Sequence, residues 1–329
     1  MRAVGAMCLA RVAGHMDGGR LMSAHIPVMR DRVVELMRPA VERAEPIVVD
    51  ATLGAGGHAE ALLLAFPGLY LIGIDRDTDA LAQARSRLHR FDGRTELTHA
   101  IYDEIGEVLD GRIVAGVLFD LGVSSMQLDR AARGFSYAHD APLDMRMDPG
   151  IGRTAADVLA DEDAESLASI LSRYGQEKFA RRIAATIVRR RDSTAFTRSS
   201  QLVDAVRDSI PAAARRTGGN PAKRTFQALR IEVNDELRAL GRALPDALDS
   251  IDVGGRVIAM AYHSLEDRIV KRTFAAHTTV DVPRHLPVTS INAKFTAVTR
   301  GAEQAGAEEI EVNPRAKPVR LRAIERTAA

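Results

Sequence analysis

The sequence is poor in cysteine, and this scarcity limits the sites that the chain can build. Cys8 is the one cysteine among 329 residues. The chain therefore cannot close an internal disulfide, and it offers neither a cysteine-based zinc site nor the ligands of an iron–sulfur cluster. A protein without disulfides fits a reducing compartment, so we expect a cytoplasmic location.

Long apolar runs are missing as well. No run reaches the roughly 18 residues that a membrane-spanning helix needs, so we expect no membrane partner. With 46% hydrophobic and 27% charged residues, the composition is typical of a globular protein and excludes a collagen-like, wholly disordered or coiled-coil chain. At about 100–200 residues per domain, the length allows two or three domains with a sizeable core.

The N-terminal segment lacks the continuous apolar stretch of a secretory signal. Gly5, Arg11, Gly14 and His15 interrupt it. We therefore expect residues 1–23 to be a disordered or misannotated leader, and an export signal is the other interpretation.

Short apolar runs alternate with helical segments over much of the remaining chain. Buried strands are expected at residues 47–51, 69–74, 96–100, 114–121 and 255–262, with helices at 59–65 and 79–88. Strands that alternate with helices indicate a doubly wound parallel sheet. Residues 318–325 alternate with period two, which predicts a closing antiparallel strand.

The stretch between Leu121 and Arg256 has no convincing strand pattern. Its apolar residues recur at helical spacing, and Gly175 stands where a helix-terminating glycine belongs. From Phe226 to Leu244 the spacing predicts one long amphipathic helix that returns to the sheet.

These patterns divide the chain into two expected domains. Residues 24–132 and 231–329 form a sheet domain, and residues 133–230 form an inserted helical domain with its own apolar faces.

A net charge of +1 hides an uneven distribution. Residues 173–230 hold fourteen basic residues against four acidic ones, a local excess of ten positive charges, whereas residues 140–172 are acidic. Most of these cations are arginines, whose guanidinium groups suit bidentate contacts with phosphate. The basic stretch, with its run at 189–191 and its pair at 215–216, predicts contact with a phosphate backbone. A solvated helix face is the alternative.

A glycine-rich loop follows the first expected strand. It contains Gly54, Gly56 and Gly57, and Asp75 ends the next strand eighteen positions after Gly57. Glycines at a strand end let the backbone approach a ligand, and an acid in this place can accept both hydroxyls of a ribose. The combination predicts a nucleotide site. The same glycine spacing also satisfies a loose NAD fingerprint, and a tight turn without a ligand is a further alternative.

A second loop distinguishes a methyl donor from NAD as the expected ligand, and it is part of a family resemblance. Phe119 and Asp120 end a further strand and lead into Leu-Gly-Val-Ser-Ser, where a Rossmann-like methyltransferase places residues beside the adenine, the methyl donor and the acceptor. With this loop the sequence resembles the ribosomal RNA small-subunit methyltransferase H family, also called MraW. The matching stretches, in order, are residues 25–29, 50–58, 119–125, 133–137 with 142–148, 225–237, 263–271 and 313–317.

The resemblance implies a Rossmann-like class I methyltransferase fold with an inserted helical domain that recognises RNA. It implies S-adenosyl-L-methionine as cofactor and the N4 amine of a decoding-region cytidine in small-subunit (16S) rRNA as acceptor. The partner is then the small ribosomal subunit, not DNA, and a homodimer is left open. Carried over residue by residue, the donor-binding positions are Gly56, Gly57, His58, Asp75, Tyr102, Asp120 and Gln127. Tyr102 stands at the family's usual aromatic position, where it can stack on adenine.

The resemblance leaves the group that assists the acceptor amine unassigned. Many amino-methyltransferases carry an Asp/Asn/Ser-Pro-Pro-aromatic motif, whereas this chain reads Asp-Leu-Gly-Val from Asp120. His263 and Ser264 close a strand at the carboxyl edge of the sheet, where they position substrate or, for Ser264, cap the next helix. We expect no metal. Further candidates, although acidic loop residues are more often solvated, are Asp144, Asp148 and His25.

The cysteine content also bears on the product. Methylation at cytosine C5 uses a cysteine thiolate, and radical methylation uses an iron–sulfur cluster. Because Cys8 lies in the expected leader, the sequence favours the N4 product.

Two other functions are also compatible with the sequence. An NAD-dependent oxidoreductase shares the glycine loop but needs a long C-terminal catalytic half, which is missing. A non-catalytic rRNA-binding assembly factor that keeps the nucleotide site as a relic is the second alternative, although the intact glycine loop with Asp75 and Asp120 argues against decay.

Overall fold

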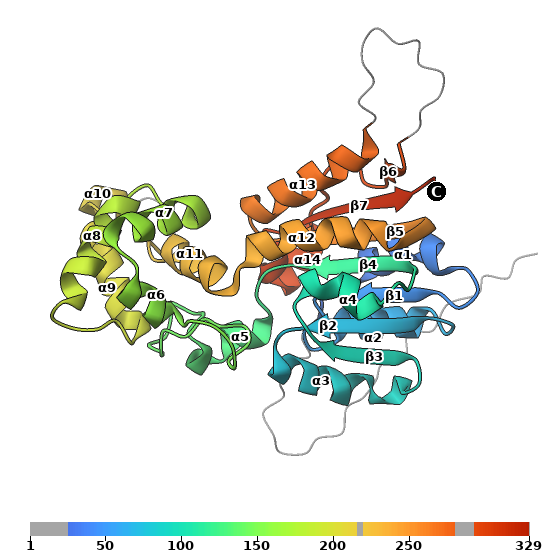
Figure 1. Ribbon diagram of the computed structural model, residues 1–329, viewed down its shortest axis with the longest axis horizontal. Helices are drawn as coiled ribbons and strands as arrows, with labels where there is room; N and C mark the ends of the chain where they lie inside the picture. Colours follow the sequence, from blue (N-terminus) through green and yellow to red (C-terminus); the bar gives the residue numbers. More distant parts are fainter. Residues whose placement is uncertain (1–25, 216–219, 280–292, 329) are drawn as a thin grey trace, which may run out of the picture.

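The computed structural model describes residues 26–215, 220–279 and 293–328. The expected leader with Cys8, the candidate His25 and the second arginine of the pair at 215–216 lie outside these residues. Within them, an α/β sheet domain adjoins a group of helices on one side (Figure 1).

Seven strands form one sheet in the order β3-β2-β1-β4-β5-β7-β6. They are β1 (Ile47–Asp50), β2 (Tyr70–Asp75), β3 (Thr95–His99), β4 (Val114–Asp120), β5 (Ile251–Ala261), β6 (Phe295–Ala297) and β7 (Arg320–Arg326). The strands β1 to β5 are parallel, and β7 runs antiparallel to both of its neighbours. The strand order reverses between β1 and β4, and open α/β sheets bind ligands at such a switch point.

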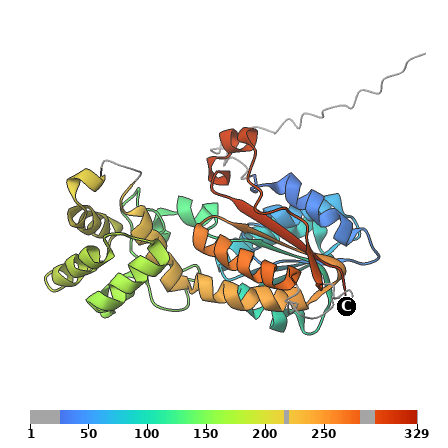
Figure 2. The same ribbon diagram turned by 90° about the horizontal axis from the view of Figure 1, so that it is seen from above.

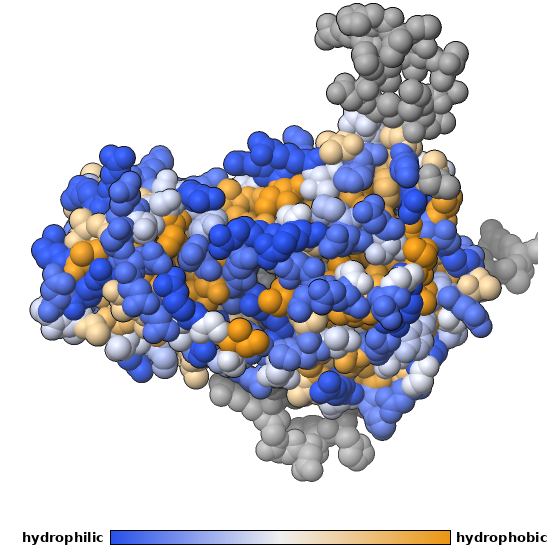
Figure 3. Space-filling model, viewed as in Figure 1, coloured by the Kyte–Doolittle hydropathy of each residue, from blue (hydrophilic) through white to orange (hydrophobic). Residues whose placement is uncertain are grey.

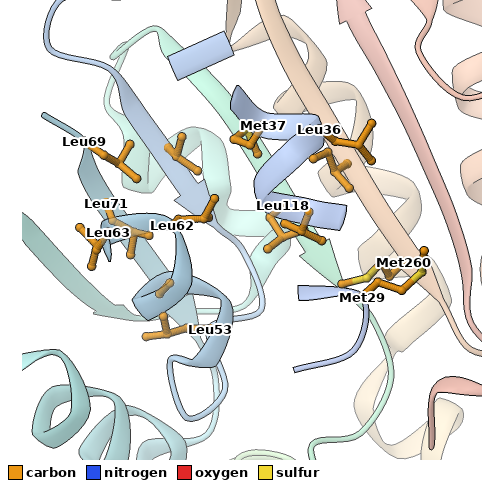
Figure 4. Packing of buried hydrophobic residues seen from close by; sticks show 14 of the residues in the cluster. Met29, Leu36, Met37, Leu53, Leu62, Leu63, Leu69, Leu71, Leu118 and Met260 are labelled. Carbon is orange, nitrogen blue, oxygen red and sulfur yellow. The ribbon is translucent and has the colours of Figure 1, made fainter. Parts of the chain in front are cut away.

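Helices cover both faces of this sheet (Figure 2). One face carries α1 (Arg30–Val41), α2 (Gly57–Ala65) and α3 (Thr78–Leu88), and the other carries α4 (Ile105–Leu109), α12 (Glu236–Asp249) and α13 (Ser264–Thr278). Figure 4 shows the first face, where Met37 of α1 and Leu62 of α2 pack with Leu71 and Leu118 of the sheet. Burial on both faces explains why the parallel strands are nearly continuous apolar runs.

The α-helices between α5 (Ser125–Asp129) and α12 in the chain form the insert. They are α6 (Ala155–Asp161), α7 (Ala164–Gly175), α8 (Ala180–Arg191), α9 (Ser199–Ser209), α10 (Ala212–Arg215) and α11 (Lys223–Asn234). Their buried side chains make a hydrophobic cluster distinct from the two clusters on the sheet. Short elements complete the described chain: η1 (His89–Phe91), η2 (Tyr102–Glu104), α5 (Ser125–Asp129), η3 (Ala131–Arg133), α14 (Ala307–Val312) and η4 (Pro314–Ala316).

The prediction of one long helix from Phe226 to Leu244 is wrong. Asp235 takes a left-handed conformation with φ 53°, which ends α11 and begins α12. Phe226 therefore packs in the insert, whereas Leu244 packs against the sheet. The apolar spacing continues across the break, so the pattern alone did not reveal it.

The structure confirms the five expected parallel strands with small shifts of their ends, and the expected antiparallel strand is β7. The sequence missed β6, which has three residues and no periodic pattern. No helix in the described part of the chain is long and apolar enough to cross a membrane.

Candidate active site

The glycine loop connects β1 to the N-terminus of α2. Gly56 is left-handed, with φ 77°, a conformation that residues with a Cβ rarely adopt. At Gly57 a Cβ would lie 2.5 Å from Cγ of Pro27. Gly56 thus permits a tight turn, and Gly57 permits close packing against Pro27. The two glycines also begin a helix, whose first backbone N–H groups lack intrahelical partners and suit a carboxylate ligand.

Asp75 ends β2 beside this loop. Its Oδ2 accepts a hydrogen bond from the Gly54 N–H at 2.7 Å, and its Oδ1 accepts one from the Asp77 N–H at 2.8 Å. Burial raises the pKa of Asp75 to about 6, and the two backbone hydrogen bonds limit that rise. Each carboxylate oxygen keeps a lone pair, so ionised Asp75 can still accept two ribose hydroxyls.

His58, in the first turn of α2, lies close to Asp120, at the end of β4. His58 Nε2 lies 3.4 Å from Asp120 Oδ2, and Asp120 also accepts a 2.6 Å hydrogen bond from the Tyr262 hydroxyl. His58 is buried, and neither of its ring nitrogens has a hydrogen bond in the described chain. Buried polar atoms without partners are costly, so this place fits a ligand that supplies the hydrogen bonds. Burial also raises the pKa of nearby Asp50 to about 7.

Tyr102 follows β3 and lies close to the end of β4. Its ring packs edge-on against Phe119, with ring centroids 6.1 Å apart, and its hydroxyl donates to the Glu236 carbonyl at 2.9 Å. Burial raises the pKa of this hydroxyl above its ordinary value, so it stays protonated and can donate. The aromatic ring is thereby fixed at the carboxyl edge of the sheet.

Gln127 is buried and both ends of its amide have protein partners. Its Nε2 donates to Asp77 Oδ2 at 2.9 Å, and its Oε1 accepts from the Ser124 N–H at 3.1 Å. Arg133 approaches the same Asp77 at 3.0 Å. Gln127 therefore ties the start of α5 to the end of β2, next to the ribose-binding position predicted for Asp75.

Two buried glutamates, Glu236 and Glu266, line a small cavity at this edge together with Thr52, Gly122 and Met147. The sequence patterns did not indicate either glutamate. Glu236 stands at the start of α12, and Glu266 lies in the first turn of α13. Both fall within stretches that carry the family resemblance, but a single glutamate in a helix has no recognisable pattern. The cavity is lined by residues of both the sheet domain and the insert.

The two glutamates have different partners. Arg230 donates to both carboxylate oxygens of Glu236 at 2.8 Å, whereas Glu266 Oε1 lies 3.2 Å from His263 Nε2. One ligand atom each from Glu236, His263 and Glu266 falls within 4.8 Å of the others, a spacing that a metal ion can use. The Arg230 guanidinium already neutralises Glu236 and would repel such a cation.

His263, rather than Ser264, caps α13. His263 Nδ1 accepts from the Glu266 N–H at 3.4 Å, and Glu266 Oε2 accepts from the His263 N–H at 3.2 Å. The capping role expected for Ser264 is therefore wrong. Ser264 is exposed, and its hydroxyl donates to Gln176 Oε1 of the insert at 3.4 Å.

The two acidic loop candidates also have partners. Burial raises the pKa of Asp144, but hydrogen bonds and charge from Arg146 outweigh burial and leave that pKa below its ordinary value. Asp148 accepts from the Gly150 N–H at 2.8 Å and lies 3.0 Å from Nε2 of His99, at the end of β3. Asp148 therefore ties the insert loop to the carboxyl edge of the sheet.

The glycine loop lies at the switch point of the sheet, with an acidic residue at the end of the next strand and an antiparallel strand β7 near the sheet edge. Together with the inserted group of helices, these features define a Rossmann-like class I methyltransferase. The model of the MraW methylase family matches residues 22–327, and the chain belongs to this family. Its methyl donor is S-adenosyl-L-methionine, so the oxidoreductase interpretation is wrong.

Relatives cover nearly the whole chain. Ribosomal RNA small subunit methyltransferase H of Saccharopolyspora erythraea is 58% identical over 317 residues, which is 94% of this chain and 96% of the relative. The protein of the same name from Frankia alni is 59% identical over 310 residues, 92% of this chain and 95% of the relative. A solved structure of an rRNA methylase from Streptococcus thermophilus covers 92% of this chain and 99% of its own, at 14% identity and a TM-score of 0.42.

Proposed function

We propose that this chain transfers the methyl group of S-adenosyl-L-methionine to the N4 amine of a decoding-region cytidine in small-subunit (16S) rRNA, in the cytoplasm. The observation that supports the proposal is the buried Asp75 carboxylate beside the glycine loop at the switch point, in a family whose curated relatives are named for this subunit. The described residues include no cysteine, so they offer no thiolate for the C5 route.

In this proposal the donor lies along the glycine loop, formed by Gly56 and Gly57. Asp75 accepts the ribose hydroxyls, Tyr102 stacks on adenine, and the N-terminus of α2 receives the carboxylate. His58 and Asp120 supply polar contacts between β1 and β4. Gln127 keeps the wall of this site in place through Asp77.

The sulfonium supplies an activated methyl group. The N4–C bond forms as the S–C bond breaks, the electron pair of that bond goes to sulfur, and N4 loses a proton. Because the N4 lone pair is delocalised into the ring, alignment and an acceptor for the N–H both promote attack.

Glu266 is the carboxylate that we assign to this acceptor role. Burial raises its pKa, but the charge and hydrogen bond of His263 and the charge of Arg230 outweigh burial, so the pKa lies below its ordinary value and Glu266 is ionised. Glu236 is less suited because each of its oxygens accepts a hydrogen bond from the Arg230 guanidinium. In Glu266 the Tyr262 and His263 N–H groups both donate to Oε2, which leaves Oε1, beside His263 Nε2, for the amine.

The insert supplies contacts to rRNA phosphates, but the run at 189–191 contributes less than its sequence suggests. Arg190 pairs with Asp208 at 2.7 Å, and Arg191 donates to the carbonyls of Leu159 and Glu162 at 2.7 and 2.6 Å. Two of the three arginines therefore hold the insert together.

Other cations of α8 are available for phosphate. Arg181, Arg182 and Arg189 are exposed, and none has a carboxylate partner among the residues that the structure describes. Their guanidinium groups suit phosphate oxygens, and each contact releases counterions from the RNA. We propose that residues 133–230 act as the RNA-recognition domain chiefly through this face of α8.

The test is methyl transfer from labelled S-adenosyl-L-methionine to small subunits that lack the modification. We expect transfer to the 16S rRNA and none to DNA. Binding of the donor without transfer to any form of the subunit would favour the relic assembly factor and contradict the proposal.

A further inference from the structure

The outer face of α13 carries a row of cations that the active site does not use. Arg268, Lys271 and Arg272 are all exposed, and their spacing of three and four residues places them on one face of the helix. None of them has a carboxylate partner in the part of the chain that the structure describes. We call these three residues the α13 strip.

Many other exposed arginines are neutralised locally. Examples paired with a carboxylate at 2.6–2.7 Å are Arg90, Arg153, Arg198 and Arg242. The acids of α13 do not compensate the strip, because Glu266 is buried and Asp267 binds Arg322 at 2.7 Å. The strip therefore presents three uncompensated positive charges, which favour a polyanion.

The strip begins beside both the active site and the insert. The N-terminus of α13 follows the carboxyl end of β5, and Ser264 contacts Gln176 at the end of α7. Arg224 of α11 donates to the Gln176 carbonyl at 3.0 Å, so a cation of the insert lies at this seam. From Ser264 to Arg272 the helix advances about 12 Å.

Further polar residues lie near this seam. Figure 3 shows hydrophilic residues over much of the insert and along the upper edge of the molecule, with a hydrophobic patch directly below that edge. Arg173 and Lys178 of the insert are exposed next to Gln176 in sequence. On α13 the strip is followed by exposed Ala275 and Ala276, whose small side chains allow a nucleic-acid backbone to approach closely.

We infer that the α13 strip binds backbone phosphates of the rRNA substrate and so extends the insert's RNA contact onto the methyltransferase domain, along the helix that follows the carboxyl end of β5. The identity of the RNA rests on the proposed function. The strip itself is inferred from exposure, missing carboxylate partners and continuity with the insert.

The test replaces all three cations, as Arg268→Gln, Lys271→Gln and Arg272→Gln. We expect at least tenfold weaker binding to small subunits and to naked 16S rRNA, with a salt dependence that is shallower by about two in log–log slope. The affinity for S-adenosylhomocysteine and kcat at saturating subunit should be unchanged, while KM rises.

A matched control removes three exposed cations elsewhere on the sheet domain, outside α13, as Arg85→Gln, Arg300→Gln and Lys317→Gln. Equal salt slopes for the strip variant, this control and the parent would overturn the inference. Loss of binding to whole subunits but not to naked rRNA would overturn it too, because the strip would then contact a ribosomal protein.

Failure of the proposed function would give a different result from failure of the inference about the strip. The parent enzyme would bind the donor but methylate no rRNA, whatever the binding of the strip variant. If the parent also fails to bind rRNA, the inference about the strip falls with it.

Discussion

We expect the carboxylate of Asp75 to determine how donor binding depends on pH. Its pKa is raised to about 6 by burial, and only the ionised form can accept both ribose hydroxyls. The affinity for S-adenosylhomocysteine should therefore be full near pH 8 and fall as the pH drops through about 6. The stability of the fold depends on pH in the opposite direction to donor binding. A carboxyl whose pKa is higher in the folded state stabilises the fold at low pH, and this contribution is lost as the pH rises through about 6.

Calorimetric titration across this range tests the assignment. Asp75→Ala should weaken binding at pH 8 by on the order of 2–4 kcal/mol, about 30-fold or more, and should flatten the profile near pH 6. Asp92→Ala, at an exposed acid after η1, is the control. A change under about threefold in Asp75→Ala would count against a ribose contact.

Glu266 offers a second test at this scale. Glu266→Gln keeps an oxygen that can complete the capping box of α13 but removes the negative charge that accepts from the N4 amine. We expect kcat to fall about 100-fold with donor affinity unchanged. Single-turnover methyl transfer gives the rate, and an unchanged kcat in a folded variant would remove Glu266 from the mechanism.

At the scale of elements, the junction of α11 and α12 joins the two parts of the molecule. Buried Asn234 ends α11, where its Oδ1 accepts from the Met147 N–H and its Nδ2 donates to the Met145 carbonyl, both at 2.7 Å. Arg76, just after β2, donates to the Asn234 carbonyl at 2.7 Å. One side chain and its backbone thus connect the insert loop, α11 and the sheet edge.

Removing this amide leaves buried backbone groups without partners. Asn234→Ala should lower the free energy of unfolding by about 2–4 kcal/mol. Urea denaturation measures it, and Asn220→Ala, at an exposed asparagine before α11, should cost about 1 kcal/mol or less. Equal losses in the two variants would show that the buried amide has no special role.

Sequence patterns predicted the elements well where apolar residues recur along one face of an element, and less well where two elements meet. Gly175 was expected to end α7 in a left-handed turn, but Gln176 takes that conformation, with φ 50°. A Cβ at Gly175 would lie 2.6 Å from the Arg224 carbonyl, so the glycine lets α7 and α11 approach closely. Such a contact depends on the tertiary fold, and local spacing carries no signal for it.

At the scale of the whole molecule, the sheet domain and the insert meet around the site. His99 with Asp148, Arg133 with Asp77, and Ser264 with Gln176 join the two parts. The positions of the glycine loop and Asp75 could be predicted because they follow strand ends in a recognisable loop pattern, whereas Tyr102 and Gln127 came from the family resemblance. Glu236 and Glu266 could not be predicted, because folding brings together two helices that are unrelated in sequence. The domain boundaries and the roles of the donor-binding residues stay predictions.

In the proposed function the methyl group reaches the exocyclic nitrogen of cytidine without a covalent adduct. Mass spectrometry of nucleosides from small subunits treated with the parent and with Cys8→Ser tests this step most directly. We predict N4-methylcytidine in equal yield from both proteins, because an amine acceptor needs no thiolate. A methyl group on C5, or a folded Cys8→Ser variant that makes no product, would contradict the account.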